Sequence, residues 1–478
     1  MIDLLLVNPK DRGTPFELIP PLGLAYIAAC ARAGGFSVKL FDYEVEQQPL
    51  EKHLAELQPR VVGISGTTHT RYQSFDIARR VKRFSSEIKT VFGGVHASFT
   101  GRDTLAHVPD VDIVVRGEGE ESMTAILRTL KAGQGELAHI PGLLFRENGG
   151  IVETGPPVRI QDIDVLPGPA WDLLAMNRYA LKMEFLNKRG IAFISSRGCT
   201  MQCTFCSASA MYGHDVTCHS PVYVLDQLQV LIEKYGYEGI RFFDSTITLR
   251  RSHVEGICAE IERRGLTFPW ECEIRVGTVD RPLLERMRRA GCYYVDFGIE
   301  SASQRVLDTM CKGFRLERAE ELLNWCEDLG LKTKVFFSIG HIGETMADVE
   351  QTFRFIEQHR RRISTLACGA GVRIYPGTYL ETYAREQGLL PPDFSWSEIY
   401  SDPRLVDLSQ DPSIPLLLQP GLGVNELSAI RLRIIGQRFR GWAGVKALLG
   451  KLFQRQSWSK LGAAVRLCLM RVTTRSAH

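Results

Sequence analysis

The chain has 478 residues, which corresponds to about two to four domains, and its 44% hydrophobic and 24% charged residues are typical of a protein with sizeable buried cores. The first residues carry no basic leader, and no later run reaches about 18 apolar residues, so we expect neither a signal peptide nor a membrane span. The net charge of +3 is unevenly distributed, because residues 431–478 contain 11 Lys and Arg and no acidic residue, which leaves the remainder at −8.

The first third of the chain alternates apolar, strand-like runs with amphipathic helical stretches such as residues 23–33 and 71–84. Five such runs predict a doubly wound parallel sheet, an α/β architecture that binds ligands beyond the carboxyl ends of its strands. The expected strands are residues 2–8, 37–42, 61–65, 90–92 and 112–115.

Glycine and small polar residues gather where three of these strands end, as SGTT at 65–68, GGVH at 93–96 and RGEGE at 116–120. Glycine lets the backbone approach a bulky ligand, so the three turns are candidates for one binding edge. Any one of them taken alone is better explained as an ordinary strand-to-helix turn. The candidate ligand contacts are Ser65, Thr67, Gly93, Gly94, His96, Gly117, Glu118 and Gly119.

Together with PPLGL at residues 20–24, these turns resemble the cobalamin-binding domain that precedes many radical S-adenosylmethionine (SAM) enzyme cores. The resemblance implies that the eight candidates contact cobalamin. The chain lacks the DxHxxG motif whose histidine ligates cobalt in cobalamin mutases, and radical SAM relatives commonly lack it too. We therefore interpret His96 as a loop residue or a contact to a ligand phosphate, in preference to a metal ligand.

The alternating pattern breaks after residue 140. Residues 142–154, with Asn-Gly-Gly at the centre, predict a hairpin, and the prolines of residues 156–169 predict an irregular linker. We accordingly divide this part of the chain into a cobalamin-binding domain over residues 1–140 and a hairpin with a linker over residues 141–189.

Strand–helix alternation resumes at residue 190, with helical stretches such as 222–235, 254–264 and 346–358. Six strand–helix units are too few for a closed eightfold barrel, and they predict a partial (β/α)6 barrel over residues 190–388 with its active site at the carboxyl ends of the strands. A helical, basic extension over residues 389–478 is expected to follow. The expected barrel strands are residues 191–196, 239–243, 270–276, 293–299, 332–339 and 367–374.

Three cysteines in the spacing CxxxCxxC, Cys199, Cys203 and Cys206, follow the first barrel strand. Three thiolates on one loop suit a 4Fe–4S cluster with one open iron, whereas a closed zinc site needs four protein ligands and a four-cysteine ferredoxin run leaves no iron free. The loop, including the aromatic Phe205, resembles that of the radical SAM superfamily. The resemblance implies that SAM chelates the open iron, that Phe205 contacts SAM, and that SAM is cleaved to a 5′-deoxyadenosyl radical.

Polar residues recur at the ends of the following barrel strands, and in relatives such positions bind SAM. Asp244 resembles a residue near the SAM amino group, Arg275 could pair with the SAM carboxylate, and Glu300 could accept hydrogen bonds from the ribose. Helix capping by the two acids and a structural ion pair of Arg275 are the alternatives. His341 occupies a turn that resembles GxPGET and is a candidate substrate contact. We assign no residue to catalysis itself.

These features predict a cobalamin-dependent radical SAM methyltransferase that methylates an unactivated carbon of a hydrophobic metabolite such as a lipid, an isoprenoid or a tetrapyrrole. An oxidative cyclase or ring-modifying enzyme that uses cobalamin without methyl transfer is the alternative. A methylthiotransferase needs cluster cysteines in its first domain, where only Cys30 is present. A non-catalytic cobalamin sensor would leave the three cluster cysteines unexplained.

The remaining cysteines are scattered and predict reduced thiols in the cytoplasm, where an electron donor such as flavodoxin or ferredoxin would reduce the cluster. In residues 431–478, apolar residues at helical spacing are interleaved with Lys and Arg, which suits peripheral contact with the inner face of the membrane and equally a helix packed on the acidic body. Nucleic acid is not an expected partner, because the body is acidic.

Overall fold

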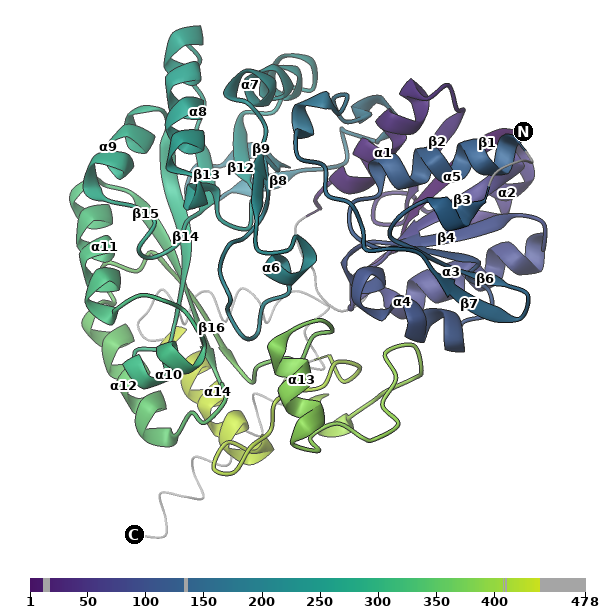
Figure 1. Cartoon of the computed structure of the whole chain (residues 1–478). Helices are drawn as coiled ribbons and strands as arrows, with labels where there is room; N and C mark the ends of the chain where they lie inside the picture. The colour runs from purple at the N-terminus through teal and green to yellow at the C-terminus, as the bar shows by residue number, and fades with distance from the viewer. Residues whose placement is uncertain (12–17, 133–135, 407, 409–410, 439–478) are drawn as a thin grey trace.

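The computed structural model describes residues 1–11, 18–132, 136–406, 408 and 411–438, which form two α/β domains side by side (Figure 1). Of the predicted membrane-contact segment, residues 431–478, the structure describes residues 431–438, and residues 439–478 lie outside the described residues. No helix in the described part of the chain is both long enough and apolar enough to span a membrane.

The N-terminal domain contains a seven-stranded sheet of order β2-β1-β3-β4-β5-β6-β7, in which the first five strands are parallel, as predicted. Alternate side chains of β1 enter the two cores on either face of the sheet, Leu4 and Leu6 on one side and Leu5 and Val7 on the other. The strands are β1 Ile2–Asn8, β2 Val38–Asp42, β3 Pro59–Ser65, β4 Lys89–Gly93, β5 Ile113–Val115, β6 Leu143–Glu147 and β7 Gly150–Glu153. The helices are α1 Leu22–Ala33, α2 Leu50–Leu57, α3 Arg71–Phe84, α4 Val95–His107 and α5 Glu120–Ala132.

The hairpin of β6 and β7 pairs antiparallel with β5 and extends the first sheet. From the sequence, this hairpin is grouped with the linker between the domains. Its turn pattern predicts a hairpin but does not specify which strand the hairpin pairs with. The chain then crosses to the second domain through short 3-10 turns, η2 Ile163–Val165 and η3 Trp171–Leu173.

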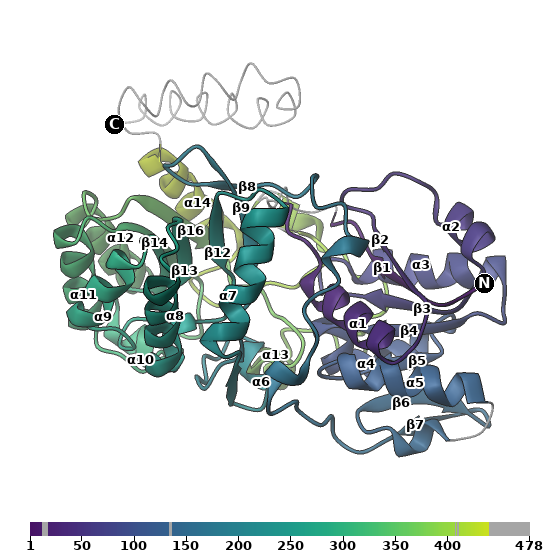
Figure 2. The same cartoon turned by 90° about the horizontal axis from the view of Figure 1, so that it is seen from above.

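The second domain is the predicted open half-barrel of six parallel strands, with β8 added antiparallel at its edge in the order β16-β15-β14-β13-β12-β9-β8. Its outer helices α9, α11 and α12 lie on the face turned away from the N-terminal domain (Figure 2). The strands are β8 Leu181–Met183, β9 Lys188–Phe193, β12 Gly239–Phe242, β13 Trp270–Glu273, β14 Cys292–Glu300, β15 Lys332–Ile339 and β16 Thr365–Ala370. The helices are α7 Pro221–Gln229, α8 Arg251–Arg264, α9 Arg281–Arg289, α10 Gln304–Thr309, α11 Leu316–Asp328 and α12 Met346–Gln358.

The first barrel strand ends earlier than predicted, at Phe193, and the chain re-forms a short strand β10 at Ser196–Gly198. This strand pairs antiparallel with β11 at Val216–Cys218. The cysteine motif and the short helix α6 at Ala208–Met211 therefore lie in the loop between β10 and β11. The antiparallel hydrogen bonds between these two strands, the β10–β11 ladder, hold the two ends of the loop together.

The C-terminal extension is only partly helical among the described residues. Helix α13, Tyr379–Glu386, ends just before this extension begins at residue 389. Within the extension α14 spans Val424–Arg438, and the described chain before it is mostly irregular apart from the 3-10 turn Pro403–Val406. This irregular chain runs along the lower side of both domains in Figure 1, and α14 lies against β16.

Candidate functional site

A cavity of about 470 Å³ lies between the carboxyl edge of the first sheet and the mouth of the half-barrel. Six predicted cobalamin contacts line it from the sheet side: Ser65, Gly93, Gly94, Gly117, Glu118 and Gly119. The barrel side contributes Arg197, Cys206, Met211, Phe243 and Ser245. The cavity therefore joins the strand ends of both domains, where each domain was predicted to bind its cofactor.

The glycines of the sheet edge provide the fit for a bulky ligand. A Cβ on Gly93 would meet no protein atom closer than 3.9 Å, so a side chain there would occupy the cavity itself. Gly94 and Gly117 have φ of +98° and +73°, which disfavours any residue with a side chain. A backbone edge kept free of side chains in this way suits cobalamin.

The other two predicted cobalamin contacts do not line this cavity. The backbone N–H of Thr67 donates to the Oγ1 of Thr70, just before α3. The His96 ring is fully buried, with its Nδ1 3.2 Å from the Oγ1 of Thr68. Burial, aided by the charge of Arg71, lowers the pKa of His96 to about 3, so the ring is neutral. Direct contact of either residue with cobalamin stays a prediction.

The three cysteines of the motif are free, partly exposed thiols on the loop between β10 and β11. Burial raises the pKa of Cys203 and of Cys206, while the nearby charge of Lys312 favours both thiolates. No three His, Cys, Asp or Glu side chains of the described residues are grouped to hold a metal ion. A cubane takes each thiolate on a different iron, and three such donors on one rim loop match that requirement.

The cluster loop is fixed to the barrel on both sides. The backbone N–H of Thr204 donates to the carbonyl of Met310 at 3.2 Å, and its carbonyl accepts from Leu380 at the start of α13 at 3.0 Å. The Sγ of Cys203 lies 4.0 Å from the carbonyl oxygen of Cys311. These contacts bring the motif against the chain that follows β14.

Arg275 and Glu300, predicted to bind SAM, lie at the ends of β13 and β14. Arg275 is 8% exposed, and its guanidinium has no ion-pair partner among the described residues, so it is available to the SAM carboxylate. Glu300 accepts from the Oγ of Ser338 at 2.8 Å and pairs with the Nζ of Lys312 at 3.3 Å. This constellation suits a ligand that carries both a carboxylate and hydroxyl groups.

Lys312 was not predicted, because its local sequence does not distinguish it from a surface lysine. It is 6% exposed, and its ammonium lies 5.8 Å from the centre of the Phe205 ring. Phe205 in turn packs edge-on against His341, with 5.1 Å between ring centroids. The aromatic residue of the motif is thus held between a buried cation and a neutral imidazole.

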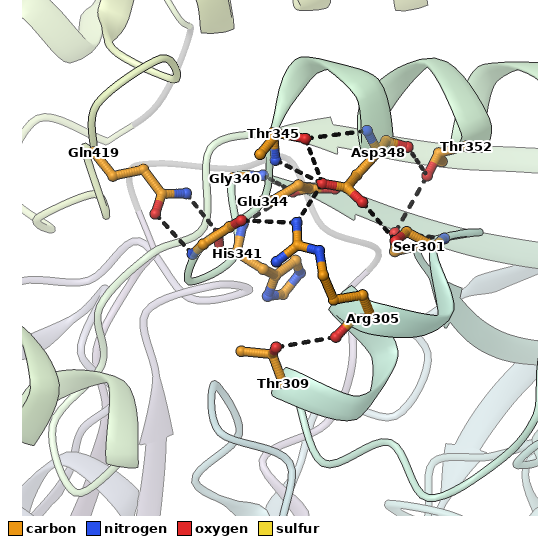
Figure 3. A network of polar contacts seen from close by, with 12 residues as sticks. Ser301, Arg305, Thr309, Gly340, His341, Glu344, Thr345, Asp348, Thr352 and Gln419 are labelled. Carbon is orange, nitrogen blue, oxygen red and sulfur yellow. Dashed lines mark hydrogen bonds and ion pairs between the residues drawn. The ribbon is translucent and has the colours of Figure 1, made fainter.

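His341 belongs to a tightly hydrogen-bonded turn after β15 (Figure 3). The carboxylate of Glu344 accepts from the backbone N–H of Gly340 at 2.6 Å and of His341 at 3.1 Å. Gln419 of the C-terminal extension donates to the carbonyl of His341 at 2.6 Å. Burial lowers the pKa of His341 to about 3, and its Nε2 lies 2.7 Å from the Oγ of Ser338, which contacts Glu300. His341 is therefore linked to Glu300 through Ser338, and its contact with a substrate stays a prediction.

Asp244 is almost completely buried behind the cavity wall formed by Phe243 and Ser245. Its Oδ1 accepts from the backbone N–H and the Oγ of Ser195 and from the Oγ of Ser196, while its Oδ2 has no hydrogen-bond partner among the described residues. Burial raises its pKa to about 6 despite these hydrogen bonds. The observed contacts fix the start of the cluster loop, and contact with SAM stays a prediction.

Both halves of the chain match known families. Residues 12–127 match the B12 binding domain and residues 193–356 match the Radical SAM superfamily. The chain is 34% identical to an uncharacterised methyltransferase of Pyrococcus horikoshii, over 82% of this chain and 84% of that protein. It is 28% identical to an anaerobic magnesium-protoporphyrin IX monomethyl ester cyclase of Rubrivivax gelatinosus, over 73% and 65% of the two chains. It is 27% identical to a hopanoid C-3 methylase of Methylococcus capsulatus, over 92% and 82%.

A solved structure has the same two-domain fold. The radical SAM methyltransferase TsrM of Kitasatospora setae superposes with a TM-score of 0.71 at 19% identity, over 90% of this chain and 89% of TsrM. The relative from Pyrococcus horikoshii extends the match through both domains at an identity that indicates common descent. The chain belongs to the cobalamin-dependent radical SAM methyltransferase family, and its cofactors are a 4Fe–4S cluster, SAM and cobalamin.

Proposed function

We propose that this enzyme transfers a methyl group to an unactivated carbon of a hydrophobic metabolite such as a lipid, an isoprenoid or a tetrapyrrole. The observation that carries the proposal is the single cavity that reaches from Gly93 and Gly117 to Cys206 and Phe243. A substrate between the two cofactor edges would be in reach of both. The hopanoid C-3 methylase, which matches 92% of this chain, supports a hydrophobic substrate.

Cobalamin supplies a transferable methyl group when bound, and the cluster with SAM supplies the radical that removes hydrogen from the substrate. The chain's own residues orient these groups and exclude water. Arg275 is placed to bind a carboxylate, and Glu300, paired with Lys312, is placed to accept hydrogen bonds from hydroxyl groups. Phe243, 39% exposed at the cavity wall, presents an apolar ring to a hydrophobic substrate.

The test is anaerobic incubation of the reconstituted enzyme with SAM, a reductant, cobalamin and candidate hydrophobic substrates. Methyl transfer predicts both 5′-deoxyadenosine and S-adenosylhomocysteine, with the methyl group of labelled SAM found in the product. Turnover of a substrate with 5′-deoxyadenosine but without S-adenosylhomocysteine would identify the oxidative cyclase alternative and reject methyl transfer. Failure to cleave SAM would support a non-catalytic sensor.

We further propose a cytoplasmic enzyme that receives electrons from a flavodoxin or ferredoxin and contacts the membrane through residues 431–478. Helix α14 packs on the barrel, with Arg433 paired to Glu350, so a truncation should keep residues up to 438. Sedimentation with anionic liposomes is expected for the full chain and not for the truncated chain. Equal sedimentation of both would reject this contact.

A further inference from the structure

Arg197 connects the two domains at the wall of the cavity. It belongs to β10 and precedes the first cluster cysteine by two residues. Its Nη1 lies 2.6 Å from the Oε1 of Glu118, and its Nη2 lies 2.7 Å from the Oε1 of Glu120. Both carboxylates come from the glycine-rich turn of the first domain, so one guanidinium links the predicted cobalamin edge to the cluster loop.

The two acids are themselves anchored by other parts of the chain. The second oxygen of Glu118 accepts from the backbone N–H of Ile160 in the linker at 2.8 Å. Glu120 is the first residue of α5, where the helix dipole stabilises a carboxylate. The three side chains are only 11%, 5% and 5% exposed, so solvent screens their interaction little.

Arg197 is held on its other sides as well. Its guanidinium lies 5.2 Å from the centre of the Tyr26 ring, and its backbone carbonyl accepts from Arg159 at 2.7 Å. Burial alone would lower the pKa of Arg197, but the charges of Glu120 and Glu118 raise it well above its ordinary value. Tyr26, Glu118, Glu120 and Arg197 all line the cavity.

We propose that Arg197, Glu118 and Glu120 form an interdomain clamp that sets the distance between cobalamin and the cluster, and thereby couples SAM cleavage to methyl transfer. Arg197 is then a positioning residue. A misplacement of reacting groups by about 1 Å can lower a rate on the order of 100-fold. The part of this inference that concerns coupling rests on the proposed methyl transfer, whereas the part that concerns distance requires only that both cofactors are bound.

The experiment compares Arg197→Gln and Arg197→Lys with a control, Arg32→Gln. Arg32 pairs with Asp172 at 2.8 Å and joins α1 to the linker, but its side chain is 44% exposed and does not line the cavity. Pulsed EPR of holoenzyme containing cob(II)alamin and the reduced cluster measures the distance distribution between the two paramagnets. A parallel assay counts 5′-deoxyadenosine formed per methylated product.

The clamp predicts a narrow distance distribution in the wild type and in Arg32→Gln, and a broadened or shifted one in Arg197→Gln. The same variant should form about fivefold more 5′-deoxyadenosine per product, because small displacements penalise the transfer step. Arg197→Lys should be intermediate, since it keeps the charge and loses the fork that binds two carboxylates.

An unchanged distance distribution in Arg197→Gln would overturn the proposal. If Arg197→Gln does not retain both cofactors, Glu120→Gln replaces it, because this variant keeps the Glu118 contact and should still broaden the distribution. If even the wild type yields no methylated product, the proposal of methyl transfer is rejected. The EPR comparison of the variants still decides whether the clamp exists.

Discussion

Two largely buried arginines near the predicted cofactor sites, Arg197 and Arg275, differ in whether the protein itself supplies an ion-pair partner. The described residues give Arg197 two carboxylate partners and give Arg275 none. A buried guanidinium without a partner carries a desolvation cost that an anionic ligand relieves. Arg197 therefore holds two parts of the protein together, whereas Arg275 is placed to bind the carboxylate of a cofactor.

Replacing Cys203 with Ala is expected to abolish 5′-deoxyadenosine formation and to lower the iron content, because a cubane with an open iron needs all three thiolates. Cys311→Ala is the control, since Cys311 is exposed and approaches Cys203 through its backbone carbonyl. Iron analysis and SAM cleavage measure both effects. Normal cleavage by Cys203→Ala would refute the assignment of the cluster ligands.

Asp244→Asn tests the raised pKa of a buried carboxyl. The folded pKa of about 6 exceeds the ordinary value of 3.8, so the stabilising protonated form is lost as pH rises from about 4 through 6. Asn keeps the Oδ1 acceptor and removes the charge. The wild type should therefore lose about 3 kcal/mol of unfolding free energy relative to the variant between pH 4 and 7, measured by urea denaturation of cofactor-free protein. A pH-independent difference would contradict this expectation.

At the scale of elements, the ladder between β10 and β11 requires a glycine at its end. Gly198 has φ +102°, and a Cβ there would lie 2.0 Å from the carbonyl oxygen of Asp215. Gly198→Ala is expected to open the ladder and to reduce cluster incorporation severalfold, as measured by iron content and visible absorbance.

Gly213→Ala is the matched control for this change. Gly213 lies in the same loop with φ +66°, but no atom lies within 4 Å of the position that a Cβ would take there. It therefore carries the backbone strain of a left-handed residue without the clash. Equal cluster loss in the two variants would show that strain alone, and not the ladder, limits cluster binding.

The elements that the sequence predicts best are those with a strong local pattern. The expected bounds of α3, α12 and β15 agree with the structure residue for residue, because their apolar residues recur at helical or strand spacing. The pairing of the hairpin with β5 and the ion pairs of Arg197 with Glu118 and Glu120 were not predictable in the same way. Arg197 lies 79 residues from Glu118, and local patterns do not report contacts over that separation.

At the scale of the whole molecule, the C-terminal extension joins the two domains through Arg71 of α3. The fully buried guanidinium donates to the carbonyl of Trp396 at 3.0 Å and to that of Ser413. Arg71→Met would leave these carbonyls unsatisfied, at a cost of about 3 kcal/mol. We expect a lower thermal midpoint and separate unfolding of the two domains in calorimetry.

The control for Arg71→Met is Arg79→Met, on the same helix, where the arginine is 49% exposed and pairs with Asp76. This exposed pair should contribute less than about 1 kcal/mol. A thermal midpoint lowered equally in both variants would indicate that the buried donor has no special role in joining the domains.

The contact between Arg71 and Trp396 spans 325 residues of chain. During synthesis on the ribosome, α3 emerges long before the carbonyls of Trp396 and Ser413. Until the extension folds back, Arg71 has its partners within the first domain, the carbonyl of Thr68 and the hydroxyl of Tyr72, and the rest of its guanidinium is open to water. The contacts of Arg71 with Trp396 and Ser413 form only when the extension has been synthesised and has folded back onto the first domain. Arg71 is therefore fully buried, with all of these hydrogen bonds formed, only in the completed enzyme, and not in the nascent first domain.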